Sequence, residues 1–500
     1  MLKRFRTMAV AILAALLAPQ SLQAAPPTAD VLREIDQIFE TWRLDSHVPG
    51  LVYGVVQDGR LVAVRSLGVQ DPTSKAPVTA DTRFRIASMS KAFTALAILK
   101  LRDEGRLSLD APAETYVPEM RSWTYPTRDS RKIRVRDLLH HTAGFVTDDP
   151  WGDRQQPLSE AAFTQMLKTG VPFARSSGLA MEYSNFGYAT LGRIITNVSG
   201  MPYQAYIGDT IQAPLGMGST SYDVAKSPAE RRANGYRWQD DAWVREPDMA
   251  DGAFGAMGGV ETTANDYARW VGFLLSAWPP RDDAEAGPVA RATVREIVEG
   301  SNFPRGVMRA TTAGEPCRIA RTYGMGWIVI DDCDLGRYLT HGGGYPGYGS
   351  NVLLLPDRGV GIFALSNRTY AGPSVPVLRA ALALADVDAI PDRLVPVSQG
   401  VREAYQVVRG VWAAGTVAGA RPALAINFLM DRDEARWARD LARLKAEVGA
   451  CPASEAVTPL TAMEATFTWT CEHGRIKGGF LLAPTRAVAL QRLDLEVAKP

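Results

Sequence analysis

Strand-forming segments stand at both ends of the first 385 residues, with helical and loop segments between them. Residues 50–56 and 61–64 are apolar runs joined by a tight Asp58-Gly59 turn, a pattern that predicts a β-hairpin. Residues 323–366 alternate β-rich runs with Gly, Asp and Pro turns, which predicts an antiparallel meander. Strands this far apart in the sequence need one shared sheet, with the helices gathered elsewhere. This arrangement predicts the α+β class.

The helices are predicted from apolar positions at helical spacing and from capping residues. Gly144 and Gly200 are expected to stop two of them, and Thr262 or Thr263 to cap another. The expected helices are 29–43, 92–101, 136–144, 189–198, 264–277 and 375–385.

Ser88 is followed three residues later by Lys91, directly before the apolar segment 92–101. If Ser88 opens that helix, positions i and i+3 share one face, and the Lys91 ammonium reaches the Ser88 hydroxyl. A serine hydroxyl is a weak nucleophile, and a partly buried lysine with a lowered pKa can accept or relay its proton. The N–H groups at the helix start can also stabilise an oxyanion. Alone, the pair is equally typical of a helix cap with a surface lysine.

Two further motifs can carry chemistry. Tyr183-Ser184-Asn185 precedes the helix 189–198. A tyrosine near a lysine can act as a general base once the positive charge lowers its pKa, and Asn185 can donate to a substrate carbonyl. His341-Gly342-Gly343 ends a strand of the meander, where small residues let a substrate lie along a strand edge and the next N–H can complete an oxyanion hole. Alone, these motifs are also typical of an aromatic helix start and a glycine-rich turn.

Together the three motifs resemble the signature of the serine β-lactamase and penicillin-binding-protein superfamily, which is S-x-x-K, then Ser- or Tyr-x-Asn, then Lys-Thr-Gly on a strand. They occur in that order, at a helix start, in a loop before a helix and on an expected edge strand. The Tyr183 variant and the flanking residues 138–144, 183–200 and 341–367 are similar to class C enzymes and their DD-peptidase and esterase relatives. The resemblance covers residues 30–385. It implies a β-lactamase-like antiparallel sheet flanked by helices, plus a mainly helical domain.

The resemblance also implies a role for each motif residue. Ser88 would be the nucleophile, Lys91 its proton acceptor or relay, and Tyr183 the base that also delivers a proton to the leaving group. The expected oxyanion hole consists of the N–H groups of Ser88 and Gly344, and the expected substrate-binding residues are Asn185, His341, Gly342 and Gly343.

His341 departs from the family pattern, because β-lactamases usually have a lysine there that recognises the substrate carboxylate through its charge. A histidine is mostly neutral at pH 7 and donates fewer hydrogen bonds. This difference favours peptidase, amidase or esterase activity over efficient β-lactam hydrolysis.

The first 24 residues are typical of an export signal, with a positive start, an apolar run and a small-residue cleavage point. The apolar run 8–17 is too short to favour a membrane span, and an uncleaved anchor is the alternative. The four cysteines form two local pairs, which predicts the disulfides Cys317–Cys333 and Cys451–Cys471 in an oxidising compartment. Four buried free thiols are the alternative. We expect an exported protein, periplasmic or secreted.

The chain divides into four expected segments. These are a signal peptide (1–24), a serine hydrolase domain (25–385), a proline-spaced linker (386–399) and a small α+β accessory domain (400–500). In the last unit we expect helices 401–414, 423–430 and 433–448 and strands 465–471, 475–482 and 488–493. Its partner and chemistry cannot be assigned from the sequence.

Composition and the lack of other motifs exclude several functions. A net charge of +1 with interleaved signs argues against a nucleic-acid or anionic-membrane surface. Residues 342–347 match the dinucleotide pattern G-x-G-x-x-G, but a strand rather than a helix is expected after them. No G-x-S-x-G or H-E-x-x-H motif occurs, and His140-His141 is expected to be one buried and one exposed helix residue. We therefore expect no cofactor and no metal.

The sequence thus predicts an exported serine hydrolase that cleaves an amide or ester bond of a small molecule or short peptide through a Ser88 acyl-enzyme. One alternative is a carboxylesterase for small esters on the same fold. Another is a penicillin-binding or sensor protein without turnover.

Overall fold

The structure is a computed structural model that describes residues 27–300, 302, 305–386, 390, 393, 395–452 and 456–498. The expected signal peptide, residues 1–24, lies outside the described residues. None of the helices in these ranges is both long enough and apolar enough to cross a membrane.

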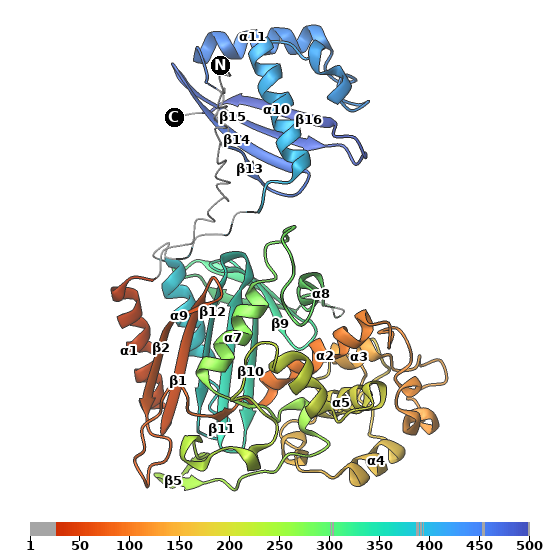
Figure 1. The fold of residues 1–500 in the computed structure, drawn as a ribbon, viewed down its shortest axis with the longest axis vertical. Helices are drawn as coiled ribbons and strands as arrows, with labels where there is room; N and C mark the ends of the chain where they lie inside the picture. The colour runs from red at the N-terminus through yellow and green to blue at the C-terminus, as the bar shows by residue number, and fades with distance from the viewer. Residues whose placement is uncertain are drawn as a thin grey trace, which may run out of the picture.

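An eight-stranded antiparallel sheet forms the centre of the larger unit (Figure 1). Its spatial order is β2-β1-β12-β11-β10-β9-β8-β7, so the hairpin from the start of the chain pairs with the last strand of the meander. The hairpin turn is tight because Asp58 and Gly59 both adopt positive φ, of 49° and 76°. The strands are β1 (Gly50–Gln57), β2 (Arg60–Gly68), β7 (Arg305–Ala310), β8 (Pro316–Tyr323), β9 (Ile328–Asp332), β10 (Gly336–Tyr345), β11 (Tyr348–Leu355) and β12 (Val360–Ser366).

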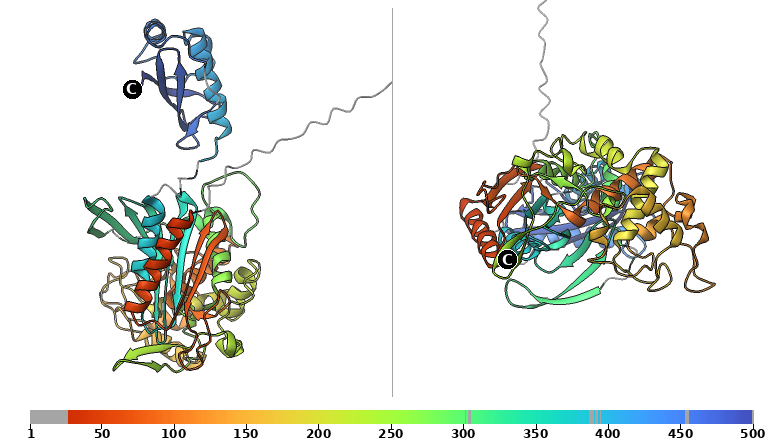
Figure 2. Two further views of the ribbon diagram at one scale, coloured as in Figure 1. Left: turned by 90° about the vertical axis from the view of Figure 1, so that its left-hand side faces the viewer. Right: turned by 90° about the horizontal axis from the view of Figure 1, so that it is seen from below.

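Helices cover both faces of this sheet. On one face α1 (Ala29–Asp45) packs with α9 (Ser374–Asp386), as the left view of Figure 2 shows, and on the other α7 (Ala264–Leu275) packs on β1 and β2. Neighbouring residues of β1 therefore enter different cores: Val52 lies in the core with α7, and Tyr53 in the core with α1 and α9.

A mainly helical part follows β2 and packs beside the sheet (Figure 1). Its central helix is α2, which is buried on nearly all sides and contacts α5. A helix that is apolar around its whole circumference needs such complete burial. The helices are α2 (Lys91–Asp103), α3 (Val135–Leu139), α4 (Glu160–Thr169), α5 (Asn185–Ser199), α6 (Tyr203–Ile207) and α8 (Arg291–Glu296).

The last unit has its own sheet and its own core (Figure 1). Aromatic side chains of both helices and of the sheet, including Trp412, Trp437 and Trp469, form that core. The elements are α10 (Gln399–Ala414), α11 (Glu434–Val448), β13 (Thr458–Pro459), β14 (Glu464–Cys471), β15 (Gly474–Leu482) and β16 (Leu490–Val497). With the larger unit, this arrangement confirms the predicted α+β class, whereas the exact segment boundaries stay predictions.

Some local predictions were wrong. The helix expected to stop at Gly144 ends at Leu139. The helix expected over residues 423–430 is absent: a 3₁₀ helix (Ala418–Ala423) is followed by a β-bridge at Leu424 and by turns over residues 426–430. The strands β7 and β8 were not predicted, because β7 is almost wholly exposed and the few apolar residues of β8 are interrupted by Arg321. His140 and His141 are both buried, not one buried and one exposed, because packed elements surround both rings.

Candidate active site

Ser88 lies in a short 3₁₀ turn (Ala87–Ser90) directly before α2, so it precedes the helix rather than opening it. The turn is held from behind, because the Ser90 hydroxyl accepts a hydrogen bond of 3.0 Å from the Val260 N–H. Ala87 is held at φ 48°, a left-handed conformation that is costly for a residue with a Cβ. The strained turn leaves Ser88 only 7% exposed.

Lys91 lies behind the serine, fully buried at the start of α2. Its Nζ is 3.0 Å from Ser88 Oγ, 2.7 Å from Asn185 Oδ1 and 2.8 Å from the Met257 carbonyl oxygen. Burial lowers the pKa of Lys91 to about 8, against the opposing effect of nearby aspartates. A neutral amine could keep its bonds to the two carbonyl oxygens and accept the Ser88 proton.

Tyr183 lies on the other side of the same hydroxyl. It shares a hydrogen bond with Ser88, and Lys91 Nζ is 4.9 Å from the centre of its ring. We expected the lysine to lower the pKa of Tyr183, but burial raises that pKa well above its usual value of 10. The expectation was wrong in direction because loss of hydration and the negative charge of Asp149 both raise the pKa of Tyr183. Tyr183 is therefore a neutral phenol at physiological pH.

Asn185 is fully buried, and both polar atoms of its side chain have partners in the protein. Its Oδ1 accepts from Lys91, and its Nδ2 donates to Asp149 Oδ1 at 2.5 Å. The structure thus places Asn185 behind the serine, where it orients Lys91. The substrate contact that we expected from it stays a prediction.

The motif at His341 lies on β10, which is not the expected edge strand of the sheet. β10 pairs with β11 on one side and with β9 on the other, but the β9 pairing ends at Thr340. The backbone from His341 onward therefore has a free edge on that side. Gly343 allows this strand to approach the Ser88 turn, since a Cβ there would lie 2.3 Å from the Ile86 carbonyl oxygen.

His341 itself is buried and neutral. Burial lowers its pKa to about 3, so it stays uncharged at physiological pH. Its Nδ1 lies 2.6 Å from the Gly342 carbonyl oxygen and must donate to it, so Nε2 accepts from the Tyr323 hydroxyl at 3.0 Å. Neither nitrogen is left to donate to a substrate carboxylate.

A cavity of about 480 Å³ opens beside these groups. Five of the predicted site residues line it, namely Ser88, Tyr183, His341, Gly342 and Gly344. The other three, Lys91, Asn185 and Gly343, are not among the residues that line it. The structure therefore brings together all three motifs, from α2, from the start of α5 and from β10.

Sequence reasoning missed several residues of this site. Asp149, Asp153, Arg321 and Tyr370 line the cavity but belong to no motif. His141 packs against Tyr183 with ring centres 4.3 Å apart and the ring planes tilted by 41°, and its Nδ1 accepts from the Ser184 N–H. Of these residues, only His141 could have been found from the sequence, because it lies in the segment 138–144 that resembles the family.

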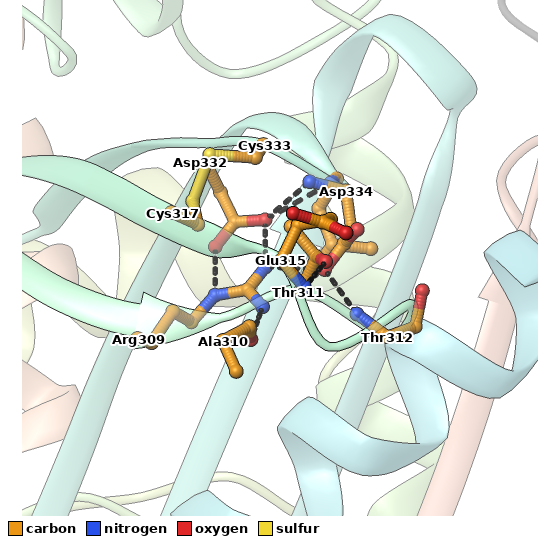
Figure 3. The surroundings of a disulfide bond; sticks show 10 residues. Arg309, Ala310, Thr311, Thr312, Glu315, Cys317, Asp332, Cys333 and Asp334 are labelled. Atoms are coloured by element: carbon orange, nitrogen blue, oxygen red, sulfur yellow. Dashed lines mark hydrogen bonds and ion pairs between the residues drawn. A yellow bond between two sulfur atoms is a disulfide. The ribbon is translucent and has the colours of Figure 1, made fainter.

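Both expected disulfides are present, Cys317–Cys333 and Cys451–Cys471. The first ties β8 to the end of β9, beside the ion pairs of Arg309 with Asp332 and Asp334 (Figure 3). Disulfides are typical of an oxidising, exported environment. Within the part of the chain that the structure describes, no three His, Cys, Asp or Glu side chains are grouped as metal ligands.

The comparison with known families decides the classification. The beta-lactamase family model matches residues 29–387. The chain belongs to this family. Membership of this family supports a function like that of serine hydrolases and penicillin-binding proteins.

Individual relatives agree with the family. Protein flp of Staphylococcus aureus (strain N315) is 30% identical over 349 residues, which are 68% of this chain but only 64% of that relative. The uncharacterized protein MT1414 of Mycobacterium tuberculosis is 29% identical over 321 residues, 59% of this chain and 78% of its own length. The octameric penicillin-binding protein homologue from Pyrococcus abyssi shares the fold, with a TM-score of 0.59 and 19% identity over 94% of this chain and 98% of its own.

Proposed function

We propose that this protein is an exported serine hydrolase that cleaves an amide or ester bond of a small molecule or short peptide. One observation carries the proposal: the buried Lys91 amine lies 3.0 Å from the Ser88 hydroxyl at the wall of a cavity. A serine so paired is an activated nucleophile.

Acylation begins with attack of Ser88 Oγ on the carbonyl carbon, as its proton passes to Lys91. The carbonyl oxygen becomes an oxyanion, for which the N–H groups of Ser88 and Gly344 would be the donors. The C–N or C–O bond then breaks, and the leaving group takes a proton relayed through the Tyr183 hydroxyl. Lys91 can be the acceptor because burial lowers its pKa, whereas Tyr183 keeps its proton.

Deacylation requires a water molecule to attack the Ser88 ester. The water gives one proton back through the same amine and phenol, its oxygen joins the acyl carbon, and Ser88 regains its hydroxyl. The products are a carboxylic acid and the amine or alcohol already released, so hydrolysis needs no further reagent.

The neutral His341 indicates which class of substrate the site favours. A β-lactam carries a carboxylate, and both ring nitrogens of His341 are occupied by Gly342 and Tyr323. This arrangement favours a peptidase, amidase or esterase over an efficient β-lactamase. A carboxylesterase for small esters is the second candidate, since such substrates need no charged contact.

The test is covalent labelling of the purified protein with a fluorescent fluorophosphonate and a fluorescent penicillin. We expect labelling at Ser88, its loss in Ser88→Ala and its retention in Ser122→Ala, an exposed serine. Labelling that survives Ser88→Ala would place the nucleophile elsewhere. Substrate turnover then separates the candidates. Hydrolysis of p-nitrophenyl esters alone indicates an esterase, and hydrolysis of D-Ala-D-Ala peptides indicates a peptidase. A stable adduct without turnover indicates a penicillin-binding or sensor protein.

A further inference from the structure

Charged side chains of both signs line the cavity beside Ser88. Asp149 and Asp153 come from the loop between α3 and α4, on the helical side. Arg321 comes from β8, on the sheet side. Burial raises the pKa of Asp153 to about 7, so this carboxyl is only partly ionised at neutral pH. The proposed reaction uses none of these three side chains.

The two aspartates lack a cationic partner. Asp153 is 4% exposed, and its Oδ2 accepts a hydrogen bond of 3.1 Å from the Tyr370 hydroxyl. Asp149 accepts from the neutral amide of Asn185. Neither carboxylate forms an ion pair with any residue that the structure describes, although Lys91 is close enough to interact through space. A buried carboxylate without a counter-ion, such as Asp153, is costly, so a cationic ligand here would be stabilised, and the exposed Asp149 carboxylate lies close enough to act on the same ligand.

The neighbouring Asp148 shows the contrast. Its two oxygens accept the N–H groups of Asn185 and Phe186 at the start of α5, at 2.7 and 2.8 Å. This carboxylate caps a helix and does not line the cavity. Asp149 and Asp153 face the cavity instead, and of these two Asp149 also accepts the hydrogen bond of the Asn185 amide.

Arg321 is the matching feature on the sheet side. It is exposed and, within the described ranges, forms no ion pair, whereas Arg309 and Arg337 on the same part of the sheet pair with aspartates. It is also the one permanent cation among the described residues that line the cavity, since His341 is neutral. A guanidinium binds a carboxylate with two parallel hydrogen bonds.

We propose, on the basis of the proposed hydrolase function, that this cavity selects a substrate charged at both ends. A cationic group, such as a free ammonium, would lie against Asp149 and Asp153, and a carboxylate against Arg321. A short peptide or amino-acid amide or ester of this zwitterionic kind suits a cavity of about 480 Å³.

The test measures how well small compounds protect Ser88 from fluorophosphonate labelling, so that it needs no turnover. The probes are dialanine in its D,D and L,L forms, its N-acetyl derivative, its C-terminal amide and the doubly blocked compound. For at least one chirality we expect dialanine to protect at a concentration about tenfold lower than either singly blocked compound.

Variants assign each preference. In Asp153→Asn, the protecting concentrations of dialanine and N-acetyl-dialanine should lie within about twofold of each other. In Arg321→Gln, the protecting concentrations of dialanine and its C-terminal amide should lie equally close. Asp209→Asn and Arg128→Gln, at exposed positions, are the matched controls that should keep both preferences. Because Arg321 is exposed, its variant should fold even if Asp153→Asn does not.

The outcomes separate this inference from the proposed function. If Ser88 is labelled but the blocked compounds protect as well as dialanine, or none protects, the charge selection is overturned and the hydrolase proposal stands. Preferences that survive both variants would overturn the assignment to these residues. If Ser88 is not labelled, the proposed function fails, and this inference fails with it.

Discussion

Lys91 Nζ donates a hydrogen bond of 2.7 Å to Asn185 Oδ1, across 94 positions of the sequence. The bond joins the start of α2 to the start of α5. An amide oxygen is a neutral acceptor, so it orients the amine without adding a charge that would raise its pKa. This contact allows a buried lysine to be both fixed in place and available as a base.

The rate of Ser88 acylation should therefore follow the ionisation of Lys91. Only the neutral amine accepts the serine proton, and the pKa of Lys91 is lowered to about 8. The fluorophosphonate labelling rate should thus rise about tenfold per pH unit below pH 7 and level off above about pH 8.5. A labelling rate that is constant from pH 6 to 9 would contradict this assignment.

Asn185→Asp should move that profile to higher pH. The new carboxylate beside Lys91 favours the ammonium and raises the pKa of Lys91, so less neutral amine is present at pH 7. The midpoint of the profile should therefore move up by about one pH unit or more. Asn197→Asp, on the exposed side of the same helix, is the control and should leave the profile in place. A normal profile in Asn185→Asp would show that Lys91 does not set it.

Tyr183→Phe should lower the labelling rate and the turnover rate by about 100-fold to 10,000-fold, because it removes the proton relay. The pH midpoint should remain near 8, since the pKa of Tyr183 is raised and the phenol does not ionise in this range. Tyr267→Phe removes a buried hydroxyl that has no hydrogen-bond partner among the described residues, and it serves as the control. A shifted midpoint in Tyr183→Phe would restore the tyrosine as the titrating base.

Gly343→Ala should destabilise the protein by about 1–3 kcal/mol and disturb the Ser88 turn. The added Cβ would lie 2.3 Å from both the Ile86 carbonyl oxygen and Ser350 Oγ. Gly208→Ala is the control, because its Cβ would meet nothing nearer than 3.9 Å. Urea unfolding measures the stability, and unchanged stability of Gly343→Ala would show that the strand does not pack this closely on the turn.

Replacing Cys317 and Cys333 together by alanine should lower the free energy of unfolding by about 3 kcal/mol, as expected for a disulfide spanning 16 positions. The bond ties β8, which carries Arg321, to the end of β9, so binding at the cavity should weaken as well. Replacing Cys451 and Cys471 together is the control: it should affect the last unit and leave Ser88 labelling intact. If both double replacements changed Ser88 labelling equally, the assignment of only the Cys317–Cys333 disulfide to the cavity would be contradicted.

Short-range patterns in the sequence correctly indicated much of the fold. The Asp58-Gly59 turn, the Thr263 cap and the Gly200 stop depend on neighbouring residues, and each occurs as predicted. The spacing of Ser88 and Lys91 also depends on a single turn of chain, and it brings the two side chains into contact. The strands β7 and β8 were missed, since β7 is almost wholly exposed and β8 buries only Cys317 and Tyr323, which is too few for a clear periodic pattern.

The sequence by itself determined the family, the α+β class and the three motifs, because local spacing and chain order carry them. Only the tertiary structure decided the electrostatics: the raised pKa of Tyr183, the partners that occupy both ring nitrogens of His341 and the position of Arg321 in the cavity wall. Burial and through-space charge depend on every segment packed around a group, and those segments come from distant parts of the chain.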